Sequence, residues 1–188
     1  VAFFAGVKAT GPDMRVTGDD YFDSSRFMDI RLVSTYGLTD KDVEAIKEVQ
    51  GIDGVYPTYS MDAIAKLNDK DHVLKVLSLP LDKLDTDDED FINRPTLVEG
   101  RYPRNSYECV VEEGLILNNN LSLGTTVTLT SGTDENIDES LAVAEYTVVG
   151  IVENPNYISY ERGTSSIGNG KISAYIMVPE DNFKLSVY

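Results

Sequence analysis

Residues 27–51, FMDIRLVSTYGLTDKDVEAIKEVQG, decide the fold class of this chain. In the first eleven of them Ile30 and Leu32 alternate with Asp29 and Arg31. Alternation with a period of two residues is typical of a strand with one buried face. The stretch therefore predicts a strand that leads directly into the next element.

The second half of the stretch has the signals of a helix. Thr39 is the predicted N-cap, Asp42 stands at the capping-box position, and Gly51 supplies the stop. Apolar side chains recur at helical spacing and form one stripe opposite a charged face, which predicts that the helix covers a sheet. The stripe consists of Val43, Ile46 and Val49.

Two further strands are expected in this first part, over residues 54–67 and 72–80, joined by the turn NDKD. The second is apolar on both faces, which is typical of a central strand. The run DKLDTDDED, residues 82–90, then interrupts the pattern and is expected to mark the passage to a second lobe.

The second part of the chain is predominantly β, with short helices. We expect one or two helical turns at residues 112–120, and Gly124 then begins a strand with Val127 and Leu129 on one face. The other predicted strands are YECVV (107–111), EYTVVGIVENP (145–155) and KISAYIMVP (171–179). The predicted fold class is α+β, with mixed or antiparallel sheets.

Composition limits the class of function. The 188 residues are 41% hydrophobic and 26% charged, which is ordinary for a folded protein of one domain or two small lobes. With 32 acidic and 16 basic residues, the net charge is −16, which repels phosphate backbones and argues against nucleic-acid binding.

The residues offer no strong metal or nucleophile motif. An EF-hand read from Asp85 puts Asp90 where Gly is needed and Thr96 where the bidentate Glu belongs. The only cysteine, Cys109, and the only histidine, His72, exclude an internal disulfide and a zinc site of N and S ligands. A Cys109–His72 dyad is formally possible, but a buried Cys109 in a strand is the favoured interpretation.

The stretch GTSSIGNGK, residues 163–171, approaches a phosphate-binding loop without matching it. Asn169 follows Gly168 where the pattern needs Lys, and in the other register Ile172 replaces Ser or Thr. The stretch also precedes a strand, whereas a P-loop opens a helix. A flexible Gly/Ser loop is expected, with no cofactor.

The chain begins VAFFAGVKAT, which is apolar up to Lys8 and then becomes polar. This pattern fits the last turns of a transmembrane helix and equally a short N-terminal strand. Composition alone leaves both interpretations open.

The order of these segments resembles a known family, the extracytoplasmic core domains of MacB/FtsX-like ABC transporter permeases of the Gram-positive type. Three stretches carry the resemblance, which covers about residues 20–183. They are FMDIRLVSTYGLTDKDVEAIKEVQGIDGVYPTY, LVEGRYPRNSYECVVEEGLILNNNLSLGTTVTLT and YTVVGIVENPNYISYERGTSSIGNGKISAYIMVP.

The resemblance implies a domain on the outer face of the cell membrane, between the first two transmembrane helices of a permease. Residues 1–10 would end the first helix and residues 11–188 would form the core domain, with a porter-like βαβ-rich lobe at about 20–85 and a β-rich inserted lobe at about 95–183. Such a domain has no active site and couples cytoplasmic ATP hydrolysis to transport or mechanotransmission. The implied partners are a separate ATPase subunit, a second permease subunit and an extracellular protein or lipoprotein.

Arg101 and Glu108 are the residues singled out in the second stretch. Arg101 could contact a partner or anchor its Gly-Arg turn by pairing with Glu99, Glu108 or a carbonyl, and the anchor is favoured. Two other functions remain as alternatives: a surface hydrolase that uses two carboxylates, and a ligand-binding or adhesion domain.

Overall fold

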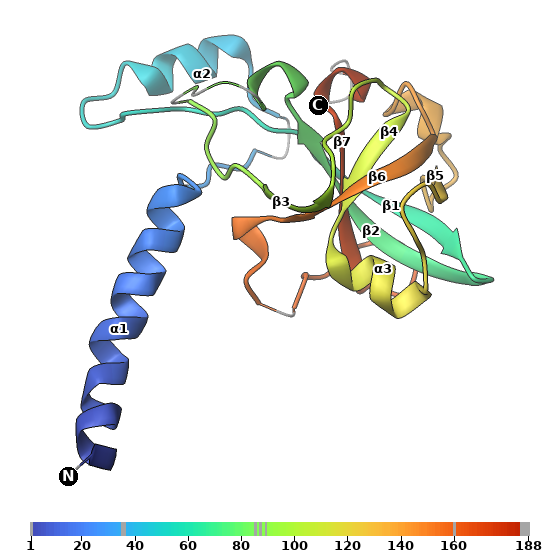
Figure 1. Cartoon of the computed structure of the whole chain (residues 1–188). Coiled ribbons are helices and arrows are strands. Elements are labelled where there is room, and N and C mark those ends of the chain that lie inside the picture. Colours follow the sequence, from blue (N-terminus) through green and yellow to red (C-terminus); the bar gives the residue numbers. More distant parts are fainter. Residues whose placement is uncertain are drawn as a thin grey trace.

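Six strands close into a barrel around the main hydrophobic core (Figure 1). The computed structural model describes residues 2–34, 37–84, 86, 88, 90–159 and 161–184. Around the barrel the strands follow one another in the order β6 (Glu145–Glu153), β4 (Glu108–Val111), β7 (Ala174–Pro179), β2 (Lys70–Leu79), β1 (Ser60–Leu67) and β5 (Thr126–Thr130), and β5 pairs back with β6.

The sheet of the barrel is mixed. β2 pairs with β7 and β4 pairs with β6 in parallel, whereas the other neighbours are antiparallel. Three short 3-10 turns, η2 (Ile137–Glu139), η3 (Pro155–Tyr157) and η4 (Glu180–Asn182), lie in the connections around β6 and β7. Together with the three helices found among the described residues, this sheet confirms the predicted α+β class.

A seventh strand, β3 (Thr96–Gly100), lies outside the ring and pairs with the C-terminal half of β6. The register between the two strands shifts between Leu97 and Glu99, which marks a β-bulge. The sequence predicted only a turn at Gly100, so this strand was missed.

The interior of the barrel is filled by alternate side chains of its strands. Val127 and Leu129 of β5 are fully buried on one face, as predicted. The predicted short helix is α3 (Glu113–Asn119), whose Leu115 joins the same core, and Figure 1 shows this helix beside one end of the barrel.

Strands from both predicted lobes lie in one sheet. β2 is central, as expected, but its neighbours come from both predicted lobes, since Leu74 lies opposite Ala174 of β7. β1 also pairs with β5 through Ala65 and Leu129. Because these pairings join residues far apart in the chain, local sequence patterns could not reveal them.

The predicted strand at residues 27–37 is wrong for the residues that the structure describes. Residues 27–34 have no regular secondary structure, while Thr35 and Tyr36 lie outside the described residues. A strand requires hydrogen bonds to a neighbouring strand, and none of the described strands pairs with this segment.

The predicted helix is present as α2 (Asp40–Lys47) with its capping box. The Thr39 side chain accepts a hydrogen bond from the Asp42 amide, and the Asp42 carboxylate accepts one from the Thr39 amide at 2.8 Å. The expectation that α2 covers a sheet is wrong, because no residue of the helix is buried. Figure 1 shows α2 beside the barrel, away from its strands.

The acidic run, which was expected to mark the passage to a second lobe, forms a strap over the outer face of the barrel. It starts with the 3-10 turn η1 (Leu81–Lys83) and ends at Phe91, while Asp85, Asp87 and Glu89 lie outside the described residues. Phe91 is buried in a second apolar cluster with Leu79, Val110, Val152, Tyr175 and Met177.

The loop at residues 163–171 is folded against the barrel, which differs from the flexible loop expected. The Ser165 amide donates to the Gly170 carbonyl at 3.1 Å, and Ile167 packs with Ile172 against Val73 of β2. Gly168 has a φ of 57°, and a Cβ there would meet the Val73 side chain. The glycines therefore serve close packing and a left-handed turn.

Replacing Ile167 with alanine should lower the free energy of unfolding by about 2 kcal/mol, since it removes apolar contacts from this small cluster. Urea denaturation measures the change, with the exposed neighbour substitution Ser166→Ala as control. Equal stability of the two variants would show that the loop does not pack as described.

Candidate functional site: the joint between helix α1 and the strap

Helix α1 (Ala2–Ser24) projects from the body of the protein, and its C-terminal end lies nearest to the barrel (Figure 1). Because residues 2–10 are helical, the alternative of an N-terminal strand is wrong. Among the described residues, no helix combines the length and the apolar character needed to cross a bilayer. The assignment of residues 1–10 to a membrane helix stays a prediction.

Three hydrogen bonds join the end of α1 to the residues just before β3. The Asn93 amide donates to the Arg26 carbonyl at 2.9 Å, and the Arg94 amide donates to the Ser25 carbonyl at 3.1 Å. In return, the Met28 amide donates to Oδ1 of Asn93 at 3.0 Å. We call residues 25–28 with residues 93–94 the joint.

Asn93 is suited to its position in the joint. Its φ is 56°, in the left-handed region that asparagine tolerates better than most residues. This conformation lets the backbone N–H and the side-chain oxygen of one residue face the same partner segment. At the helix end of the joint, the Ser25 hydroxyl donates to the Tyr21 carbonyl at 2.7 Å and closes the last turn of α1.

The strap connects the joint to the core. Nη2 of Arg94 donates to the Thr86 carbonyl at 2.6 Å, and its guanidinium lies 5.1 Å from the centre of the Phe91 ring. Lys83 pairs with Asp88 at 2.9 Å, which lowers the pKa of the Asp88 carboxyl through hydrogen bonding. Because Phe91 is buried, the strap is fixed to the barrel. A displacement of α1 therefore reaches the barrel through the joint and the strap.

A second braced segment, residues 154–159 with 161–162, follows β6. Nε of Arg162 pairs with the buried carboxylate of Glu112 at 2.7 Å, and Tyr157 stacks on Tyr175 with ring centres 4.8 Å apart. Burial raises the pKa of Glu112, although the hydrogen bond from Arg162 opposes the rise. A buried pair of this kind fixes geometry more than it adds stability.

Segment 154–162 also faces α1. Its Ile158 shares a shallow groove with helix residues that include Met14 and Tyr21. Burial and the nearby charge of Glu153 raise the pKa of Tyr21, which places this part of α1 near the end of β6. α1 is therefore contacted at two places: at the joint, after its C-terminal end, and farther along the helix, at the groove with Ile158.

The predicted anchor role of Arg101 is confirmed, with Glu108 as its partner. Nη1 and Nη2 of Arg101 donate to Oε2 and Oε1 of Glu108 at 2.7 and 2.6 Å. The Arg104 amide adds a hydrogen bond to Oε2 at 2.8 Å. These interactions lower the pKa of Glu108 to about 2.

The structure does not bring Cys109 and His72 together as a dyad. Cys109 lies in β4 with its side chain fully buried in the barrel core, and burial raises its pKa. His72 lies in β2, and β7 separates the two strands. Asn120 ends α3 in a left-handed conformation.

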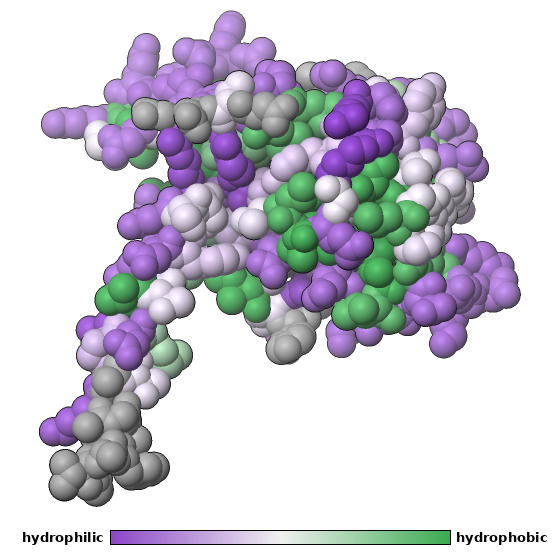
Figure 2. Space-filling view, in the orientation of Figure 1, coloured by the Kyte–Doolittle hydropathy of each residue, from purple (hydrophilic) through white to green (hydrophobic). Residues whose placement is uncertain are grey.

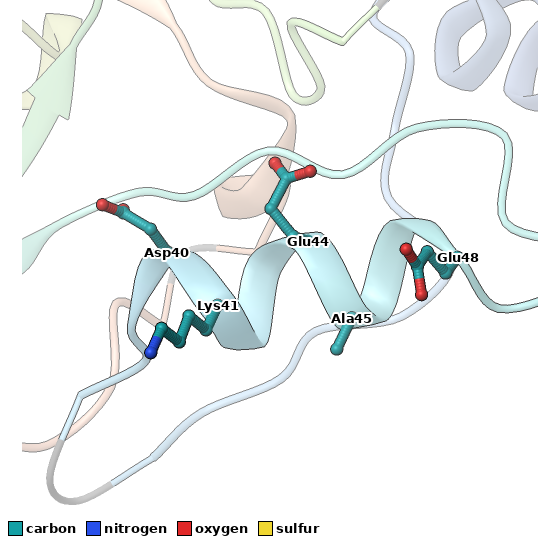
Figure 3. Close-up of a pocket in the computed structure, with 5 residues that line it drawn as sticks. All are labelled: Asp40, Lys41, Glu44, Ala45 and Glu48. Carbon is teal, nitrogen blue, oxygen red and sulfur yellow. The ribbon is translucent and has the colours of Figure 1, made fainter.

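The described residues include no group of three or more His, Cys, Asp or Glu placed to hold a metal ion. One surface hollow lies along α2, and all its lining residues belong to that helix or its C-cap. Figure 3 shows that their side chains point in different directions from the helix and do not converge. They are Asp40, Lys41, Glu44, Ala45 and Glu48.

Sequence reasoning missed the joint and the Glu112–Arg162 pair. The signal for Asn93 was its place in the stretch FINRP, where asparagine before Arg-Pro favours a turn. Nothing local pointed to Glu112 and Arg162, because fifty positions separate them in the chain.

No protein-family profile matches the chain, and no curated protein matches it. Among solved structures, the chain is similar to the extracellular domain of the noncanonic ABC-type transporter YknZ from Gram-positive bacteria, with 12% identity and a TM-score of 0.46. The match covers 79% of this chain and 65% of that domain, so the chain spans less than two thirds of its length.

Asn93→Ala should loosen the joint while the barrel remains folded. Alanine loses the acceptor for the Met28 amide and is less favourable in the left-handed region by about 1 kcal/mol. Hydrogen exchange should show a faster Met28 amide and unchanged protection of β2 amides. Asn118→Ala, on the exposed face of α3, is the control. Unchanged exchange at Met28 would contradict the joint.

The Arg101–Glu108 pair predicts a pH-dependent stability difference. Because folding lowers the pKa of Glu108 to about 2, its contribution is present above the unfolded pKa, about 4.5, and is lost as the pH falls toward 2. Glu108→Gln should therefore melt at lower temperature than the wild type at about pH 7, and the gap should shrink at about pH 3. A gap that is independent of pH would contradict this role.

Proposed function

We propose that the chain is a non-catalytic, extracytoplasmic domain of an ABC transporter permease, which transmits the movement of a membrane helix to structures outside the membrane. The observation that carries this proposal is the joint. A single helix, α1, leaves the body of the protein and is tied at its end to residues 93–94, which follow the strap that packs on the barrel. Such an arrangement can pass a displacement of the helix to the barrel.

The resemblance of three ordered sequence stretches to MacB/FtsX-like core domains supports the same proposal. In this account a separate cytoplasmic ATPase subunit binds the nucleotide, and the domain lies on the outer face of the cell membrane. The net charge of −16 fits a domain that stays soluble there. The polar residues described above serve as anchors: Arg101 holds a turn, and Arg162 holds a loop.

The location can be tested in cells with one engineered cysteine. Native Cys109 is fully buried, so it should not react in the folded protein. Ser166→Cys places a thiol on the exposed loop of the full-length membrane protein. We expect a membrane-impermeant maleimide to label this variant in intact cells and to leave the wild type unlabelled. Labelling only after the cells are lysed would contradict an extracytoplasmic domain.

The coupling can be tested by co-purification. The full-length protein should purify with an ATPase subunit, and Asn93→Ala should keep this complex while it reduces the transport or signalling that ATP hydrolysis drives. Asn118→Ala is again the control. Purification without any ATPase would contradict the permease assignment.

A further inference from the structure

Residues 28–32, MDIRL, have the sequence of a strand and no strand partner among the described residues. Ile30 and Leu32 expose 69% and 56% of their surface, and Val33 exposes 77%. In Figure 1 the segment is part of the trace between α1 and α2, outside the barrel. Exposed apolar side chains at alternate positions indicate a surface that another strand covers.

Read from either end, this segment alternates apolar and charged residues, and its two charged residues have opposite signs. Reading outward from Ile30, Asp29 and Arg31 are opposite charges, and Met28 and Leu32 are apolar side chains of similar size. In an antiparallel pair of identical strands centred on Ile30, each residue faces its mirror position in the other copy. The pairs are Met28–Leu32, Asp29–Arg31 and Ile30–Ile30.

We propose that residues 28–32 are a self-association site, at which two copies of this chain pair as antiparallel strands about a two-fold axis at Ile30. Two Asp29–Arg31 ion pairs form on one face of the new ribbon. Three apolar pairs form on the other. Opposite charges and apolar pairs directly across a ribbon stabilise it, and the isologous contact closes after two copies.

The charges required for this pairing are available. In the part of the chain that the structure describes, no hydrogen bond or ion pair links the side chains of Asp29 or Arg31 to another residue. Arg31 lies near enough to Tyr157 for its charge to oppose the rise of the Tyr157 pKa. Two copies of net charge −16 repel each other at long range, so association needs a local match of charge of this kind.

The segment is bent at Asp29 in the single chain, so strand formation and association occur together. A five-residue ribbon is smaller than a standard interface, and we expect a dissociation constant on the order of 100 µM. This inference does not depend on the proposed transport function, because it uses only the pattern and the exposure of this segment. If self-association is not found, the proposed transport function is therefore unaffected, and the reverse also holds.

The experiment uses two charge-reversing variants of the chain, Asp29→Arg and Arg31→Asp, in sedimentation equilibrium at moderate salt. Each variant alone places like charges opposite each other, and its self-association should fall at least about tenfold, which is about 1.4 kcal/mol. In a mixture of the two variants, one copy is positive at both positions and the other is negative at both, so every facing pair again has opposite charges. The mixture should therefore recover the association of the wild type.

Asp134→Arg, on an exposed loop, changes the net charge as Asp29→Arg does and should not weaken association. A wild type that stays monomeric at about 500 µM would overturn the proposal. So would single variants that associate as the wild type does, or a mixture that does not recover. Pairing of residues 28–32 with another part of the same chain would appear as one of these monomeric outcomes.

Discussion

The structure depends on the way β6 changes partner along one edge. Its N-terminal half pairs with β5 and closes the barrel, while its C-terminal half pairs with β3, and its other edge pairs with β4 between Thr147 and Ile151. Gly150 stands at this change, where a Cβ would collide with the Arg101 backbone. Glycine is therefore required for β3 to reach β6 at this point.

The closed barrel determines where the strap and the end of α1 are held on its outer face. The outer apolar faces of β4, β6 and β7 need a cover, and the strap with Phe91 supplies it. The strap in turn positions Asn93 and Arg94, to which the end of α1 is bonded. A chain of contacts thus runs from the closed sheet to the helix, and the proposed transmission uses this chain of contacts. Figure 2 shows that the face of α2 visible in this view is mostly hydrophilic, which agrees with its position outside these contacts.

Local signals in the sequence predicted most elements and not their arrangement. Thr39 and Asp42 identified α2, and the alternation of Val127 and Leu129 identified β5, because capping and periodicity are properties of neighbouring residues. The pairing of Leu74 with Ala174 could not be read in this way. The wrong strand prediction for residues 27–34 has the same cause. The residues alternate as in a strand, but no strand in the described part of the chain pairs with them. Of the site, the Arg101 anchor was predicted, whereas the joint depends on a contact between Arg26 and Asn93 across the fold.

The central claim is that α1 and the barrel move as one unit through the joint. Its most direct test is a distance measurement between spin labels at Arg15→Cys on α1 and Ser166→Cys on the barrel, both exposed positions, with buried Cys109 unlabelled. This account predicts one narrow distance distribution in the otherwise wild-type chain and a broad one when Asn93→Ala is added. A distribution that is already broad before this substitution would contradict a rigid joint.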